Sequence, residues 1–176
     1  MNVYETLLEV IDMRSFSNLW YWIVLAVVWS GASHWVLGVP YDMIQRARRG
    51  GDGAHDAMGD LEDLVGVLVR RMLLIGQVSG LWVLGFICFT LSALAILAFW
   101  YGVEFAQAVF LLAFPLTLVG GLALSTARKI VDRGLEGEGL IKALLSHRFW
   151  TQVVGIIAIF VTAMWGMYQN LLVGVI

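Results

Sequence analysis

The sequence predicts an all-α membrane protein, with four transmembrane helices that form a single domain over residues 1–176. Three observations predict this fold class. Hydrophobic residues make up 60% of the chain and charged residues only 14%, about half of what a soluble domain carries. The stretch Met72–Ser125 holds no Lys or Arg and one acid, Glu104, over a length that suits two membrane crossings. Ten of the eleven basic residues fall in two short segments between apolar stretches.

The first part of the chain predicts a surface helix followed by a crossing. Apolar residues recur at helical spacing over about 2–13, with acids between them, which is typical of an amphipathic helix lying at a membrane interface. The first crossing is predicted over about 18–39. Trp20, Tyr21 and Trp22 at its start are typical of the interfacial aromatic belt. Pro40 predicts a kink or an end there, because proline lacks a backbone donor.

The second crossing is predicted over about 72–99, after a loop over 41–71. An amphipathic pattern begins near Asp56, with Leu61, Leu64, Val65, Leu68 and Met72 on one face. No helix breaker separates it from the crossing. We therefore expect one long helix that stands out of the membrane into the cytoplasm and then enters it. Trp100–Glu104, which combines two aromatics, a glycine and an acid, is expected to turn the chain back.

The third and fourth crossings are predicted over about 105–125 and 149–172. Pro115 in the third predicts a bend rather than a stop, since neighbouring helices can satisfy the freed backbone group. The loop between them, about 126–148, is polar and glycine-rich, with a short amphipathic helix expected near Leu140–His147. No soluble domain remains once these segments are assigned.

The basic residues predict the orientation. They gather in the loops after the first and third crossings, so the positive-inside rule places both loops in the cytoplasm and both termini outside. In a bacterial inner membrane the termini then face the periplasm. The residues that define this orientation are Arg46, Arg48, Arg49, Arg70, Arg71, Arg128, Lys129 and Arg133, with Lys142 and Arg148 beside them.

Small residues mark faces where helices can approach closely. Gly76 and Gly80 form a GxxxG spacing, and similar faces occur on the later helices. Packing within the four-helix bundle is favoured over a dimer interface. The predicted packing residues are Gly76, Gly80, Thr117, Gly121, Gly155, Thr162 and Gly166.

Few side chains are candidates for catalysis or for binding a metal or cofactor. His34, one turn after Ser30, is the single candidate for ligating a pigment or haem, against the simpler role of a neutral histidine bonded to a carbonyl or headgroup. His55 and the acids that follow it lack a metal-ligand rhythm and are interpreted as a solvated helix start. Cys88, as a lone cysteine, is interpreted as a small buried apolar residue. Because no catalytic, nucleotide or metal motif is found, we expect no enzyme, no cofactor beyond bound lipid and no nucleic-acid partner.

Four segments carry a resemblance to a known family: Ile11–Trp22, Ser33–Asp42, Tyr101–Phe110 and Trp165–Asn170. Together they resemble a family of alphaproteobacterial multi-pass inner-membrane proteins, over almost the whole chain. Some members of that family bear the description "component of SufBCD complex", which implies an association with iron–sulfur cluster assembly. The family offers no catalytic residues to transfer to this chain.

Three functions follow as hypotheses. The first is a non-catalytic accessory or structural subunit of an inner-membrane complex, for instance a respiratory or photosynthetic one, with other integral subunits as partners. The second is a small homo-oligomeric channel or transporter. The third is a membrane anchor for the SufBCD iron–sulfur assembly machinery, docking through the two basic loops.

Overall fold

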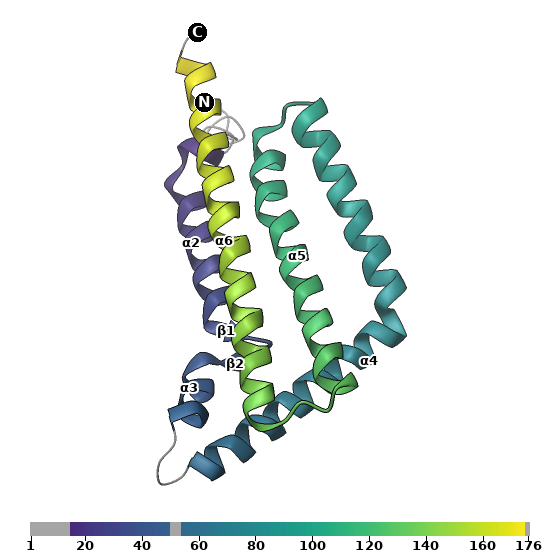
Figure 1. Ribbon diagram of the computed structural model, residues 1–176. Helices are drawn as coiled ribbons and strands as arrows, with labels where there is room; N and C mark the ends of the chain where they lie inside the picture. Colours follow the sequence, from purple (N-terminus) through teal and green to yellow (C-terminus); the bar gives the residue numbers. More distant parts are fainter. Residues whose placement is uncertain (1–14, 50–53, 175–176) are drawn as a thin grey trace, which may run out of the picture.

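The computed structural model describes residues 15–49 and 54–174, so the predicted interfacial helix over 2–13 lies outside the described residues. The described chain is almost entirely helical (Figure 1). Its elements in order are the 3₁₀ turn η1 (Ser15–Ser17), α2 (Leu19–His34), β1 (Trp35–Val36), β2 (Val39–Pro40), α3 (Tyr41–Arg49), α4 (Ala54–Ala95), the π-helical turn η2 (Ile96–Trp100), α5 (Glu104–Asp132) and α6 (Gly137–Gly174).

Four helical segments run back and forth along the long axis of the molecule (Figure 1). α2 packs on α6, α6 on α5, and α5 on α4. Three helical stretches, His55–Trp100, Glu104–Asp132 and Gly137–Leu171, are long and apolar enough to cross a membrane, as expected for a membrane protein. α2 has 16 residues, or about 24 Å of helix, which is shorter than the ~30 Å hydrocarbon layer.

The long second helix is confirmed as a single continuous element, since α4 runs unbroken into η2. Its first half, residues 54–73, lies across the ends of the other helices, and the helix then bends and continues along α5 (Figure 1). Gly76, Ser79 and Gly80, residue types that occur at helix bends, follow directly after the first half.

The helix predicted over 18–39 is shorter than expected. α2 ends at His34, and the chain then forms a tight β-hairpin in which Trp35 pairs with Pro40 and Val36 with Val39. Leu37 and Gly38 make the turn at φ values of 54° and 85°, the left-handed conformations that a two-residue hairpin of this type needs. Val36, Leu37 and Val39 are buried by the rest of the protein, whereas Trp35 is half-exposed.

The remaining helices largely follow the prediction. The chain turns at Tyr101–Val103, where Gly102 adopts a φ of 70°, and α5 begins at Glu104. α5 continues through Pro115 without interruption. The short amphipathic helix expected near Leu140–His147 is not a separate element: it forms the first turns of α6, because no glycine or proline follows it until Gly155.

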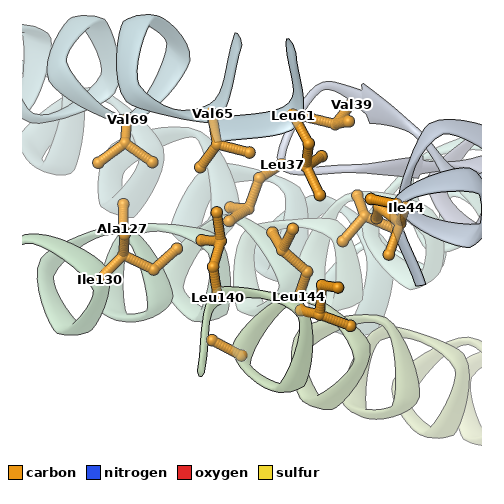
Figure 2. Packing of buried hydrophobic residues seen from close by; sticks show 14 residues of the cluster. Leu37, Val39, Ile44, Leu61, Val65, Val69, Ala127, Ile130, Leu140 and Leu144 are labelled. Carbon is orange, nitrogen blue, oxygen red and sulfur yellow. The ribbon is translucent and has the colours of Figure 1, made fainter. Parts of the chain in front are cut away.

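The largest hydrophobic core lies at one end of the molecule and not along its middle. The first half of α4 contributes Leu61, Val65 and Val69, which face residues of α5, α6, α3 and the hairpin (Figure 2). Leu61 is fully buried. The buried members of this cluster are Val36, Leu37, Val39, Ile44, Ala47, Leu61, Val65, Val69, Ala127, Ile130, Leu140, Ile141, Ala143 and Leu144.

A carboxylate ties the same end together. Glu62 Oε1 accepts a 2.7 Å hydrogen bond from the backbone N–H of Gly137, the first residue of α6. The first amides of a helix have no partner within it, and a carboxylate placed there also interacts favourably with the helix dipole. The acid predicted to be part of a solvated helix start therefore connects α4 to α6.

All ten basic residues among the described residues belong to α3, the first half of α4, the end of α5 or the start of α6. We call this end, which also holds the large core, the basic end. η1, the turn Tyr101–Val103 and the last turns of α6 lie at the opposite end (Figure 1). The described chain therefore begins, at η1, and finishes, with the last turns of α6, on the same side of the molecule, opposite the basic end.

Candidate functional site

A buried amide joins three helical elements at the end opposite the basic end. Gln107 is only 4% exposed, although it lies in the first turn of α5. Its Nε2 donates to the carbonyl of Ala98 in η2 over 2.9 Å. Its Oε1 accepts from Trp165 Nε1 over 3.0 Å and from Gln169 Nε2 over 2.6 Å, both in α6. We call these four residues the Gln107 cluster.

The hydrogen bonds of the Gln107 cluster satisfy polar groups that would otherwise lack a partner. Ala98 lies in the last turn of its helix, where backbone carbonyls lack a partner within the helix. This turn is π-helical, and the backbone N–H of Tyr101 donates to the carbonyl of Ile96. Gln107 uses both lone pairs of its side-chain oxygen. Polar groups shielded from water need such partners, so the cluster stabilises the junction of α4, α5 and α6.

A second set of hydrogen bonds attaches the start of the described chain to the same junction. Glu104 Oε1 accepts from the backbone N–H of Phe16 over 2.8 Å. The indole of Trp22 donates to the Phe16 carbonyl, and the Ser17 hydroxyl donates to Asn170 Oδ1. Glu104, the acid of the predicted turn, thus has a defined structural partner.

Three of the four segments that carry the family resemblance meet here. Phe16 and Trp22 come from the first, Glu104 and Gln107 from the third, and Gln169 from the fourth. The remaining segment, Ser33–Asp42, forms the β-hairpin at the basic end. The sequence analysis did not identify the bond between Gln107 and Gln169. Their separation of 62 residues hides it from any local pattern.

The predicted packing faces divide into two groups. A Cβ on Gly155 would lie 2.8 Å from the Trp29 ring, and one on Gly166 would lie 3.2 Å from Phe16, so both glycines allow α6 to approach its neighbours. Thr162, on the same helix, is fully buried. These three residues are packed within the single chain.

The other small residues are much less tightly packed. A Cβ on Gly76 would meet only Leu124, at an ordinary 3.5 Å, and no atom lies within 4 Å of one placed on Gly80 or Gly121. Thr117 is half-buried and donates to Phe114 of its own helix. For Gly80 and Gly121, packing against another helix stays a prediction.

His34 lies exposed at the end of α2, with its ring edge-on to Trp35 at 5.7 Å between centroids. It lines a shallow hollow together with Tyr41, Asp42, Gln45, Arg46 and Arg49. Within the described residues no three His, Cys, Asp or Glu side chains gather in a way that could hold a metal ion. Ligation of a pigment or haem by His34 stays a prediction.

The second half of α4, residues 74–95, is the least covered part of the described chain. Leu81 and Trp82 are each 83% exposed, and Val78, Phe86 and Phe89 are exposed beside them. Only 6% of the most apolar window of this helix is buried, compared with 28% for α6. Cys88, interpreted from the sequence as a small buried apolar residue, is exposed on the protein surface, because α5 covers this half of α4 on one side only. We call this surface the open face of α4.

Comparison of the chain with protein-family models, with curated proteins and with solved structures gave no match.

Proposed function

We propose that this chain is a non-catalytic accessory subunit of a bacterial inner-membrane complex and that the open face of α4 receives an integral membrane partner. In this proposal the chain crosses the membrane four times. α2 is the short crossing, and the β-hairpin that follows it remains in the packed basic end. Both termini face the periplasm, and the basic end faces the cytoplasm.

The distribution of charge supports this orientation. The ten described Lys and Arg residues lie at one end, where the positive-inside rule places the cytoplasm. The common location of the two ends of the described chain agrees with an even number of crossings (Figure 1). A β-hairpin has backbone groups that lipid cannot satisfy, and the burial of Val36 and Val39 in the large core removes that difficulty.

The open face of α4 is the observation that carries the proposal. It presents aromatic and aliphatic side chains on the side of α4 that is turned away from α5, with Val78, Leu81 and Trp82 at least 80% exposed. The glycines of this helix are not part of that face, because Gly76 and Gly80 share the opposite side, where Gly76 meets Leu124 of α5. A partner helix would cover the large apolar side chains of the open face.

The polar groups support a structural role and not a catalytic one. Gln107, Glu104 and Trp165 use their polar atoms to join elements of the protein to one another. A catalytic group would instead be directed toward a cavity where substrate could bind.

A second copy of the chain is the alternative occupant of the open face, as in a homo-oligomeric channel. The observation that favours it is that the open face is apolar from Val78 to Phe89, so that two copies could pack this face against itself. A SufBCD anchor would instead use the basic end to bind a soluble partner.

Purification of a tagged chain in a mild detergent distinguishes these functions. An accessory subunit should co-purify with integral membrane proteins in fixed stoichiometry, and Trp82→Ala should reduce that recovery. Phe160→Ala is the matched control, because Phe160 is 65% exposed on α6. A homo-oligomer would form disulfide-linked dimers through its one cysteine, Cys88, on mild oxidation. Recovery of a lone monomer would contradict the proposal.

A further inference from the structure

A groove of about 370 Å³ lies between α2 and α6, away from the Gln107 cluster. The chain directions give it a polarity. α2 runs toward the basic end and α6 runs away from it, so Ser33, Thr151 and Gln152 lie nearest that end (Figure 1). The deeper wall is apolar and consists of Trp29, Gly155, Ile156 and Ile159. Gln152 Nε2 donates to Ser33 Oγ over 3.2 Å across the groove.

A fixed cation lies at the polar mouth of this groove. Arg148, one turn before Gln152, donates from Nε to the Ser33 carbonyl over 3.3 Å. Its guanidinium carbon lies 3.4 Å from the centroid of the Tyr41 ring, which holds the group in place by a cation–π interaction. Among the described residues the two terminal nitrogens of Arg148 have no hydrogen-bond partner, so both remain free to bind an anion.

More positive charge lies beyond Arg148. Tyr41 also lines the neighbouring hollow with His34, Arg46 and Arg49. The exposed Asp42 pairs with Arg46 over 3.0 Å and offsets part of this charge. The order from the membrane outward is therefore an apolar wall, neutral hydrogen-bonding groups, Arg148 and a basic surface.

Two buried polar atoms in the groove lining lack a partner within the described residues. These are Trp29 Nε1 and Thr151 Oγ1, in side chains that are 6% and 3% exposed. Both residues line the groove. A threonine hydroxyl can rotate to donate to a ligand carbonyl, and an unpaired buried donor favours a ligand that carries an acceptor at this depth.

We propose that this groove binds an anionic phospholipid. The phosphate binds the free guanidinium nitrogens of Arg148, the acyl ester lies beside Ser33, Thr151 and Gln152, and one acyl chain runs along Gly155, Ile156 and Ile159. Basic pockets between membrane helices are the usual binding sites for anionic headgroups. Along the groove, the apolar wall, the neutral hydrogen-bonding groups and Arg148 occur in the same order as the acyl chain, the ester and the phosphate of a phospholipid. The proposal is independent of whether the open face of α4 has a partner.

Native mass spectrometry of the purified, delipidated protein tests this site with two added probes, dioleoylphosphatidylglycerol and dioleoylphosphatidylcholine. Wild-type protein should retain the anionic lipid roughly fivefold better, the factor for about 1 kcal/mol per basic residue. Arg148→Gln should abolish this preference, and Arg148→Lys, which keeps the charge, should retain much of it. Arg133→Gln is the matched control, since Arg133 ends α5 outside the groove. All variants are first checked for monodispersity.

A second variant tests whether the acyl chain binds in the groove, separately from the charge of Arg148. Ile156 is 69% exposed and lines the groove, so Ile156→Trp should obstruct the acyl chain and reduce lipid retention while leaving Arg148 in place. Glycerol phosphate, which has the headgroup charge without the chains, should not displace the lipid. The proposal is overturned by equal retention of the two lipids in wild-type protein, by an equal loss in Arg133→Gln, by full retention in Ile156→Trp, or by displacement with glycerol phosphate.

Discussion

The two halves of α4 belong to one continuous helix but have opposite surroundings. In the first half, Leu61, Val65 and Val69 are almost completely buried at the basic end. In the second half, Val78, Leu81 and Trp82 are at least 80% exposed. Helix formation therefore does not explain the difference, because both halves form the same backbone hydrogen bonds.

The comparison shows that the two halves of one helix have different roles. The first half contributes to the folded core, and the second half leaves its side chains available for contact with lipid or a partner. The first half has an amphipathic pattern and closes a core to which α3, α5, α6 and the hairpin contribute (Figure 2). The second half is apolar on all sides, as a lipid- or partner-facing helix must be. Substitutions in the first half should therefore affect stability, and substitutions in the second half should affect association.

The largest effect is expected for Leu61→Ala. Leu61 is fully buried, and its truncation should lower the free energy of unfolding by about 2–5 kcal/mol through lost burial and a new cavity. Leu81→Ala is the control on the same helix, at 83% exposure, and should change stability by less than about 0.5 kcal/mol. SDS-induced unfolding followed by circular dichroism measures both. Similar losses in the two variants would contradict the distinction between the two halves.

Gln107→Ala should have the next largest effect. It leaves the Ala98 carbonyl and the donors of Trp165 and Gln169 without their partner, which should cost about 2–3 kcal/mol. Because the amide anchors the far end of α4, this variant should also increase hydrogen exchange in η2. Gln77→Ala, at an exposed position on α4, is the control. If both variants unfolded at the same SDS fraction, the Gln107 cluster would not stabilise the junction.

A smaller effect is expected when alanine replaces a close-packed glycine. Gly155→Ala places a methyl group 2.8 Å from the Trp29 ring, and the overpacking should cost about 1–2 kcal/mol. Gly80→Ala meets no atom within 4 Å and should leave the isolated protein unchanged or slightly more stable, because alanine favours helix. The same unfolding assay compares them. A destabilised Gly80→Ala protein would mean that α4 packs more closely at Gly80 within the single chain than the structure shows.

Composition and hydropathy were sufficient to predict the helical fold, the continuity of α4 with its amphipathic first half, and the turn at Trp100–Glu104. They were not sufficient to find the end of α2. Val36, Leu37 and Val39 are apolar both in a membrane helix and in a hairpin buried by protein, so hydropathy cannot distinguish the two. The combination of Gly38 with Pro40 was the available signal for a turn.

The candidate sites depended on contacts between distant residues. Glu104 was noticed as the acid of the predicted turn, but its partner Phe16 lies 88 residues away. The Trp165 and Gln169 partners of Gln107 lie 58 and 62 residues away. Arg148 counted only as one of ten basic residues until the structure placed it against Ser33 and Tyr41. Local patterns identify which residues are unusual in a membrane, and tertiary packing decides what those residues contact.

Photo-crosslinking in intact cells tests the central claim, that the open face of α4 is covered by a partner, most directly. A benzophenone side chain replaces Trp82 on that face or, as the control, Phe160 on the exposed face of α6. We predict that the probe at position 82 forms one discrete adduct with another integral membrane protein and that the probe at position 160 does not. Lipid adducts alone at position 82, or the same protein adduct from both positions, would contradict the account.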